Sequence, residues 1–280
     1  MKNKNLIDKL AWWIPIRKWR DNFRNIFMGI QSDDKNIIDL SKIDYSNILG
    51  NEAIYKLLNN YNFKTVLDIG RGKGFHSEIF REYGKIVTSL DYEKSEYLLD
   101  IKNKQDIIIA DFMQYDFKDK IFDAIWCSHV LEHSLNTNLF LEKINSILKE
   151  DGVLAITVPQ LKNEIVSGHL NLYNAGILLY QLVVAGFDCR DAIVKKYGYN
   201  ISVIVKKNKI NIKNKLTYGR GDISTIKPYL PKQIVYNNTD RNDISFCGDI
   251  ENIGWWKSIF YYTKIVLKNN VDFLFRINLI

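Results

Sequence analysis

Short apolar runs alternate with helix-like segments through the middle of the chain, and this alternation leaves few possible architectures. The runs are KTVLDIG, KIVTSLD, DIIIAD, FDAIWCSHV and GVLAITVP, which begin at residue 64 and end at residue 159. They are continuously apolar rather than strictly alternating, which is typical of strands buried on both faces. Because strands separated by helices form βα units, we predict an α/β fold with a parallel sheet.

The flanking segments complete the predicted layout. After residue 159 come a loop, the helical segment NAGILLYQLVVAG and two β-rich runs, CRDAIVKKYGY and NISVIVKK, which would bring the sheet to seven strands. Before the first strand we expect a helix at residues 46–60 and an amphipathic helix at residues 19–30. The predicted parts are an N-terminal helical segment at 1–45, a central domain at 46–207 and a C-terminal extension at 208–280 that packs on the core.

The N-terminal segment has three interpretations: a helix packed on its own domain, a lid over the site, or an anchor to a membrane surface. Pro15 and Arg17 interrupt its apolar run, so neither an exported signal nor a spanning helix is expected. Cys127, Cys189 and Cys247 form no CxxC pair, which argues against a disulfide framework and a cysteine-bound zinc ion. We expect a soluble, cytoplasmic protein.

The charge pattern argues against a nucleic-acid partner. The formal net charge is +7, but 32 acidic residues are interspersed among 39 basic ones. The one basic stretch, VIVKKNKINIKNK, alternates with apolar residues as a strand with a solvated end would. We therefore expect no nucleic acid among the partners.

The stretch VLDIGRGKGFHS places three glycines on alternate positions after the first predicted strand. Glycine tolerates positive φ and has no side chain, so a ligand can approach the backbone closely where a strand turns into a helix. The spacing differs from the nicotinamide-dinucleotide fingerprint, because the sixth position counted from Gly70 is Phe75. The carboxylate of Asp68 would repel a pyrophosphate, whereas it suits a ligand that carries an ammonium group.

The motif D-x-G-x-G-x-G, formed by Asp68, Gly70, Gly72 and Gly74, resembles the signature of class I S-adenosylmethionine-dependent methyltransferases. The resemblance implies a Rossmann-like, doubly wound, seven-stranded and mostly parallel sheet. It also implies S-adenosyl-L-methionine as the cofactor and S-adenosyl-L-homocysteine as the product. Arg71 departs from the pattern, since a small residue or cysteine is frequent at this position.

The resemblance extends to the ends of later strands. It makes Asp91 the acid that accepts both ribose hydroxyls, and it places Asp111 beside the adenine amino group with the backbone amide of Phe112 next to it. Taken singly, Asp91 could cap a helix and Asp111 could begin a turn, but their joint occurrence favours the cofactor roles. The predicted cofactor-binding set is Asp68, Gly70, Gly72, Gly74, Asp91, Tyr92, Asp111, Phe112 and Ser128.

Histidines are the candidates for proton removal, which a hydroxyl acceptor requires as it attacks the sulfonium methyl group. His129 ends the fourth strand and His169 lies in a loop at the same edge, so both are predicted to be catalytic, with structural hydrogen bonding left open for His129. His76 is expected to serve packing or the surface. Glu132 and His133 are expected in the first turn of the next helix, as capping or orienting residues. No spacing suggests a metal, so we predict a metal-independent reaction.

The acceptor is less well defined by the sequence. The segments CSHVLEH and GHLNLYNAGILLYQLVVAGFD resemble those of bacterial methyltransferases in capsule and surface-polysaccharide biosynthesis. This resemblance implies a small-molecule acceptor, such as the hydroxyl of a nucleotide sugar or a glycan precursor. Three alternatives stay open: another small metabolite, a lipid-linked precursor that the N-terminal segment would approach at a membrane, and a catalytically silent cofactor-binding relative that acts as a partner protein.

Overall fold

The computed structural model describes residues 49–92, 95, 107–232, 234–236 and 244–245. The chain divides into two compact units, Met1–Ile43 and Asp44–Ile280, and every described residue belongs to the second. The amphipathic helix predicted at residues 19–30 therefore lies outside the described residues, as does most of the segment after residue 236. No helix within the described ranges is long and apolar enough to cross a membrane.

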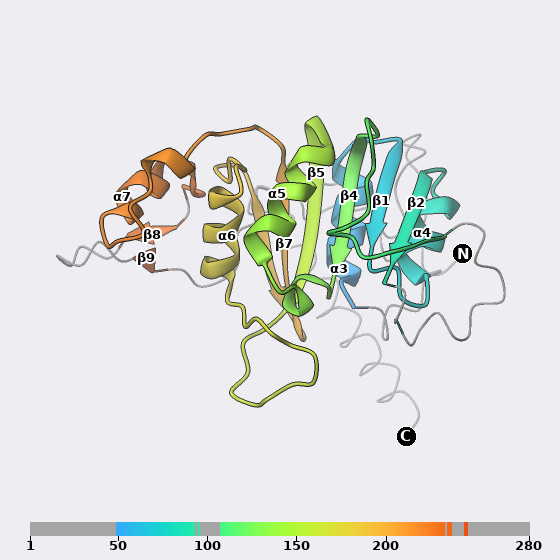
Figure 1. The fold of residues 1–280 in the computed structure, drawn as a ribbon, viewed down its shortest axis with the longest axis horizontal. Helices are drawn as coiled ribbons and strands as arrows, with labels where there is room; N and C mark the ends of the chain where they lie inside the picture. The colour runs from blue at the N-terminus through green and yellow to red at the C-terminus, as the bar shows by residue number, and fades with distance from the viewer. Residues whose placement is uncertain (1–48, 93–94, 96–106, 233, 237–243, 246–280) are drawn as a thin grey trace, which may run out of the picture. The chain divides into compact units, whose positions relative to one another are not determined.

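A seven-stranded sheet forms the centre of the described unit (Figure 1). Its spatial order is β3, β2, β1, β4, β5, β7 and β6. The bounds are β1 Thr65–Ile69, β2 Ile86–Asp91, β3 Ile107–Ile109, β4 Phe122–Ser128, β5 Leu148–Pro159, β6 Ile193–Tyr197 and β7 Asn200–Lys206. Strands β1 to β5 pair in parallel, whereas β7 is antiparallel to β5 and β6. The predicted seven-stranded, mostly parallel α/β sheet is confirmed.

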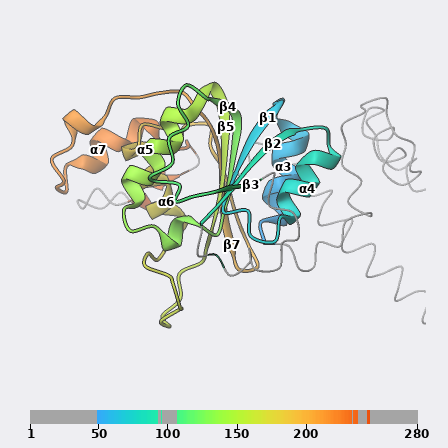
Figure 2. The ribbon, with the colours of Figure 1, turned by 45° about the vertical axis from the view of Figure 1, so that its right-hand side comes forward.

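Helices cover both faces of the sheet (Figure 2). Helices α3 (Asn51–Asn60) and α4 (Phe75–Glu82) lie on one face, and α5 (Thr137–Ile147) and α6 (Ala175–Val184) lie on the other. Helix α3 is shorter than the helix predicted at residues 46–60, because the φ of Gly50 is 75°, a left-handed value that a right-handed helix does not contain. The remaining elements are η4 Leu131–His133, η5 Lys213–Lys215, α7 Asp222–Ile226, η6 Lys227–Tyr229, β8 Val235–Tyr236 and β9 Ile244–Ser245.

The continuous apolar runs are buried on both sides of the sheet, as their pattern predicts. Val66 and Leu67, which are neighbours in β1 and point to opposite faces, are both 0% exposed. Part of the chain after residue 207 joins the same core, since Ile212, Ile226 and Leu230 are buried within it. The exact domain limits at residues 45 and 207 stay predictions.

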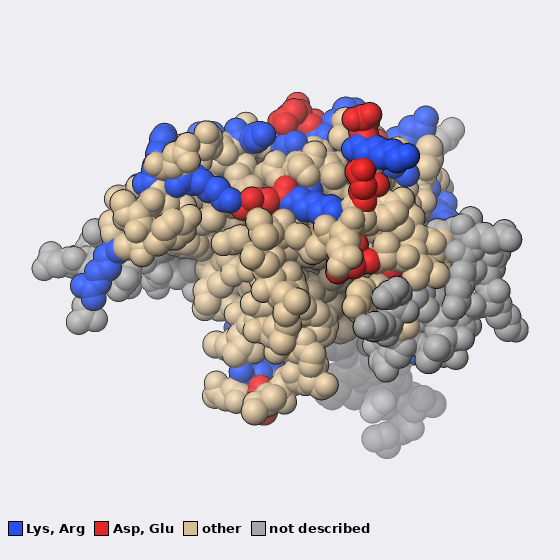
Figure 3. Space-filling model, viewed as in Figure 1, with Lys and Arg blue, Asp and Glu red and all other residues tan. Residues whose placement is uncertain are grey.

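Charged residues of both signs lie side by side along the upper part of the face that Figure 3 shows. Several basic residues after β7 are paired with acids: Nζ of Lys207 lies 3.0 Å from Oε1 of Glu150, and Lys213 pairs with Glu142. The basic stretch singled out in the sequence thus consists of β7 and a following segment that carries ion pairs.

The parallel strands bring their carboxyl ends to one edge of the sheet. The strand order reverses between β1 and β4, because β2 and β3 continue on one side of the sheet and β5 on the other. In open α/β sheets such a reversal leaves a crevice for ligands at the strand ends. The loop between β5 and α6 projects from this edge (Figure 1).

Candidate functional site

The turn after β1 is built from glycines in the left-handed region of backbone space. The φ angle is 73° at Gly70, 55° at Gly72 and 88° at Gly74. A Cβ atom added at Gly70 would lie only 2.2 Å from Cγ2 of Val130. The turn therefore packs tightly against the segment that follows β4, and at Gly70 both the backbone angle and the space require glycine.

Asp91, the last residue of β2, holds this turn from the neighbouring strand. Asp91 is 5% exposed; its Oδ2 accepts a hydrogen bond of 2.6 Å from the amide of Gly72, and its Oδ1 accepts one of 2.8 Å from the amide of Tyr92. A carboxylate has about four lone-pair sites, so about two remain for donors of a ligand. Asp91 thus shapes the turn and retains acceptor capacity for two hydroxyl groups.

Asp68 is the buried acid of the glycine turn. It is 1% exposed, and its Oδ2 accepts a hydrogen bond of 2.5 Å from the hydroxyl of Ser77 in α4. Burial, partly offset by Ser77 and by the charge of Arg71, raises the pKa of Asp68 to about 6. A carboxyl group with this pKa ionises readily when a cationic group such as an ammonium binds beside it.

Arg71, the residue that departs from the resemblance, lies over the glycine turn. A Cβ atom added at Gly74 would lie 2.3 Å from Nη2 of Arg71, and Nη1 of Arg71 donates a hydrogen bond of 3.4 Å to the carbonyl of Gly72. The turn therefore combines a buried carboxyl group with a guanidinium group. A ligand that carries both an ammonium and a carboxylate, as the methionine part of S-adenosylmethionine does, complements this pair.

The predicted adenine contacts follow β3. Asp111 begins a turn, in which its Oδ1 accepts a hydrogen bond of 2.8 Å from the amide of Met113. The ring of Phe112 is buried, with its centroid 4.7 Å from that of Phe140. These contacts hold the turn at the carboxyl ends of the strands. Asp111 thus begins a turn, the alternative considered from the sequence, and its contact with adenine stays a prediction.

Two further predicted cofactor residues are Tyr92, which follows β2, and Ser128, which ends β4. Tyr92 is 46% exposed. The hydroxyl of Ser128 is buried and has no hydrogen-bond partner among the described residues, which leaves it available to a ligand. Both residues therefore lie at the correct edge, and their cofactor roles stay predictions.

His129, predicted as catalytic, has a strained backbone at the end of β4. Its φ is 55°, which is uncommon for a residue other than glycine, while its amide still donates a hydrogen bond of 2.9 Å to the carbonyl of Thr157. Its Nε2 lies 2.8 Å from Oδ1 of Asn200, and its ring stacks on Tyr199 with 5.8 Å between centroids. Structural hydrogen bonding, the alternative left open for His129, is thus present.

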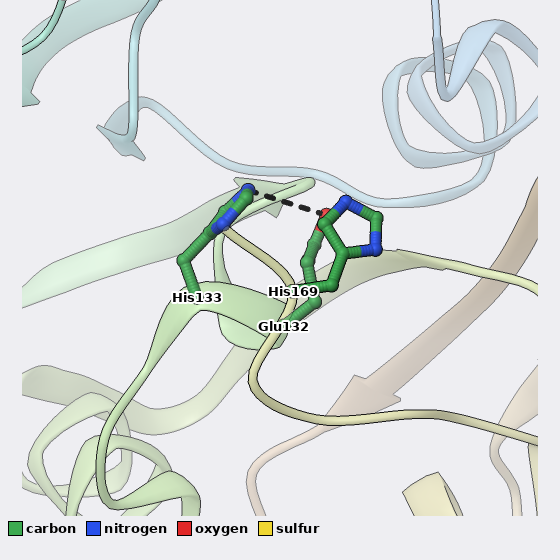
Figure 4. A group of neighbouring side chains, drawn as sticks. All are labelled: Glu132, His133 and His169. Atoms are coloured by element: carbon green, nitrogen blue, oxygen red, sulfur yellow. Dashed lines mark ion pairs between the residues drawn. The ribbon is translucent and has the colours of Figure 1, made fainter. Parts of the chain in front are cut away.

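Glu132 and His133 lie in the short 3-10 helix η4, the next helix after β4, and not in α5. Helix α5 begins only at Thr137, where Oδ1 of Asn136 accepts a hydrogen bond of 3.1 Å from the amide of Leu139 and caps the helix. The capping role therefore belongs to Asn136. Glu132 and His133 instead belong to a side-chain cluster that also contains His169 (Figure 4).

His169 reaches this cluster because the loop after β5 is tied to η4. The amides of Leu170 and Asn171 both donate to the carbonyl of Glu132, at 2.9 and 3.1 Å. The ring of His169 meets that of His133 edge to face, with 5.2 Å between centroids. Desolvation lowers the pKa of His169, so its ring is neutral near pH 7 and can accept a proton.

A shallow pocket adjoins the cluster. It is lined by the loop residues Lys162 and His169, by Pro159 at the end of β5, and by Tyr199. Nζ of Lys162 lies 4.6 Å from the centre of the Tyr199 ring, which on its other side is stacked on His129. Sequence reasoning missed Tyr199 and Asn200, because the turn between β6 and β7 carries no motif and reaches the site only through the antiparallel pairing of β7.

His76 lies away from this pocket. Its Nε2 is 2.8 Å from the carbonyl of Leu49, and its ring centroid is 4.9 Å from that of Trp126. Burial is the main cause that lowers the pKa of His76 to about 4. The contacts are those of a packing residue, as expected from the sequence.

Comparison with known proteins identifies the class of this domain. Residues 67–156, which include the glycine turn, Asp91 and η4, match the family described as "Methyltransferase domain". Residues 67–156 thus resemble a methyltransferase domain, which agrees with the predicted enzyme class and cofactor; the activity of the whole chain is a proposal.

Relatives with assigned names share only part of their length with this chain. A "Ubiquinone biosynthesis O-methyltransferase" of Glaesserella parasuis is 28% identical over 158 residues, which cover 52% of this chain and 61% of that protein. A "Malonyl-[acyl-carrier protein] O-methyltransferase" of Buchnera aphidicola is 30% identical over 113 residues, covering 39% and 45%. Among solved structures, the 1,6-didemethyltoxoflavin-N1-methyltransferase of Burkholderia thailandensis is similar with a TM-score of 0.48 and 18% identity, covering 56% of this chain and 77% of that one.

Proposed function

We propose that this chain is an active methyltransferase that transfers the methyl group of S-adenosylmethionine to an oxygen atom of a small molecule. One observation carries the proposal: the glycine turn, the buried Asp68 and the partly satisfied Asp91 meet at the reversal of strand order, inside the matched domain. Together these residues can bind one ligand that carries a cationic group, a carboxylate and two hydroxyl groups.

The chemistry that the cofactor supplies is a methyl group already activated by the sulfonium: the acceptor oxygen bonds to the methyl carbon, the carbon–sulfur bond breaks, and the sulfur keeps the electron pair. The residues of the chain have to align the acceptor with the methyl group, exclude water and take up the hydroxyl proton. His169, at the pocket edge, is proposed as the group that receives this proton, and His129 as a residue that holds the acceptor through its stack with Tyr199.

The finer proposal from the sequence is a hydroxyl of a sugar or sugar substituent in bacterial surface-polysaccharide biosynthesis. Its support is the sequence resemblance of the segment around η4 and of the loop before α6. The polar side chains of the pocket, Lys162, Asn171 and Gln160 among them, suit an acceptor with several hydrogen-bonding groups. The two relatives described above are O-methyltransferases, which supports oxygen as the methylated atom, whereas other relatives are N-methyltransferases.

A second candidate is an acceptor with an apolar part, such as a quinone precursor or a lipid-linked precursor. The loop between β5 and α6 exposes large apolar side chains: Leu161 is 54% exposed, Ile165 103%, Leu170 59% and Leu172 50%. A polar acceptor alone would not need them. The name of the Glaesserella parasuis relative, which refers to ubiquinone biosynthesis, supports an acceptor with an apolar part.

The test is incubation of the full chain with S-adenosylmethionine labelled in its methyl group, with nucleotide sugars in one panel and phenolic or isoprenoid-linked hydroxyl compounds in another. Labelled product in the first panel supports the sugar acceptor, and labelled product in the second supports the apolar one. Tight binding of S-adenosylhomocysteine without transfer to any member would instead favour the catalytically silent relative.

A further inference from the structure

Glu132 is the buried acidic residue of the cluster. The residue is 0% exposed, and neither oxygen of its carboxylate has a hydrogen-bond partner among the described residues. A carboxylate is buried at high cost unless it is paired with a cation or coordinates a metal ion. Glu132 therefore requires a positive charge beside it.

The orientation of His133 shows where a cation beside Glu132 could bind. Nδ1 of His133 lies 2.7 Å from the carbonyl oxygen of Gly168. A carbonyl only accepts hydrogen bonds, so Nδ1 carries the proton, and Nε2 of the neutral ring presents its lone pair. That lone pair faces Oε1 of Glu132 across 3.9 Å (Figure 4). A histidine held by a backbone carbonyl through one nitrogen is the usual arrangement of a metal ligand.

His169 supplies a third ligand from the loop after β5. Glu132, His133 and His169 each offer one ligand atom, and these three atoms all lie within 4.8 Å of one another. Ligand atoms around a tetrahedral zinc ion are ~3.3 Å apart for bonds of ~2.05 Å, so small side-chain rotations would close the set. Two histidines with one carboxylate form the ligand set of catalytic zinc sites and of non-haem iron sites.

We propose that Glu132, His133 and His169 bind one divalent transition-metal ion, with Zn²⁺ as the species that the ligands fit, at the edge of the acceptor pocket. Three protein ligands leave coordination positions open for an oxygen of a small molecule. This revises the expectation of a metal-independent reaction, which rested on spacing along the chain. Spacing could not reveal the site, since His169 joins Glu132 only through the contacts of the loop with η4.

A second histidine near Glu132 is part of the same environment. Nδ1 of His129 lies 3.3 Å from Oε1 of Glu132, while its Nε2 contacts Asn200. His129 thus lies beside the carboxylate that the proposed ion would bind, and a His129 protonated at both nitrogens is the competing partner for Glu132. Given the proposed methyl transfer, on which this role rests, an acceptor hydroxyl bound to the ion would lose its proton to water more readily. The oxygen anion would then bond to the methyl carbon as the carbon–sulfur bond breaks, and His169 would hold the ion instead of receiving the proton.

The binding of metal is tested on the full, untagged chain without cofactor or acceptor. Metal-free protein is titrated with Zn²⁺ by calorimetry, and with Co²⁺ while the visible absorption of the cobalt ion is recorded. We expect one ion per chain, at least 100-fold weaker binding for Glu132→Gln and for His133→Ala, and unchanged binding for the matched control His76→Ala. Circular dichroism of each variant verifies that it is folded, and the isosteric Glu132→Gln keeps the test valid if His133→Ala unfolds.

The absence of saturable binding in the wild-type chain would overturn the metal site in favour of a protonated histidine beside Glu132. Equal affinity in the wild type and in both cluster variants would overturn it as well. The affinity for S-adenosylhomocysteine is measured on the same samples, so failure of the metal site and failure of the proposed function are separate results. If S-adenosylhomocysteine binds and zinc does not, the proposed function stands without a metal.

Discussion

The edge of the sheet at the carboxyl ends of the parallel strands has two halves, which are built in different ways. The cofactor half, the turn after β1 with the end of β2, obtains its shape from backbone angles and from bonds between neighbouring strands, such as the one from Gly72 to Asp91. The acceptor half joins η4, the loop before α6 and the turn between β6 and β7, which are tied together by contacts such as that of His129 with Asn200.

The difference shows which parts of such a site a change will disturb. Residues of the cofactor half should affect binding of S-adenosylhomocysteine, and residues of the acceptor half should affect turnover. The two halves touch where Gly70 packs against Val130, the residue after His129. A mutation in the cofactor half that changes only turnover, or one in the acceptor half that changes the affinity for S-adenosylhomocysteine, would argue against this division.

His169→Ala should have the largest effect, and it should be confined to the acceptor half. Loss of a group that accepts the hydroxyl proton or holds the proposed metal ion lowers kcat by roughly 10²–10⁴-fold. The affinity for S-adenosylhomocysteine should stay within about twofold of the wild-type value, because His169 has no contact with the glycine turn among the interactions described above. Steady-state kinetics and calorimetry measure the two quantities, and near-normal turnover would contradict the role of His169.

Asp91→Ala should have the next largest effect, on the cofactor half. It removes the acceptor for two proposed ribose hydroxyls and the bond that holds Gly72. Hydrogen bonds to a charged group contribute about 1.5–3 kcal/mol each, so the dissociation constant of S-adenosylhomocysteine should rise by roughly 100-fold or more. The matched control is Asp116→Ala, which removes an exposed turn acid away from the strand ends and should leave affinity unchanged. Equal affinity of Asp91→Ala and wild type would remove the assignment.

Gly70→Ala tests the place where the two halves touch. The alanine would have to adopt a φ of 73°, and its Cβ atom would lie 2.2 Å from Cγ2 of Val130. We therefore expect the free energy of unfolding to fall by about 2–4 kcal/mol. Adding Val130→Ala removes the clash and should restore part of that loss, leaving about 1–2 kcal/mol for the backbone angle. Urea denaturation measures both variants. No rescue by Val130→Ala would mean that the contact is not tight in solution.

Asp68 gives the smallest predicted effect, a dependence on pH. Its pKa in the folded chain is raised to about 6, so below that pH a cationic ligand must displace a proton. We expect the dissociation constant of S-adenosylhomocysteine to rise up to about tenfold for each pH unit below 6. In Asp68→Asn, binding should be weak and its dissociation constant should not change with pH. By the same shift, the unliganded protein binds this proton more tightly when folded and loses stability as the pH rises from about 4 to about 6. A flat profile in the wild-type chain would argue against an ammonium partner for Asp68.

The comparison also explains what the sequence could and could not predict. Strands buried on both faces have continuous apolar runs, and a turn that needs positive φ needs glycine, so the sheet and the turn of Gly70, Gly72 and Gly74 were predictable. Helix α3 begins only at Asn51 because of the positive φ of Gly50, which the sequence pattern did not predict. The cluster around Glu132 depends on contacts between segments far apart in the chain, and only its Glu132–His133 part is local.

The most direct test of the cofactor site is a crystal structure of the chain with S-adenosylhomocysteine. The account predicts the nucleoside across the ends of β1 and β2, with both ribose hydroxyls within hydrogen-bonding distance of Asp91 and the amino group beside Asp68. A crevice closed by the side chain of Arg71, or the ligand bound elsewhere on the chain, would contradict it.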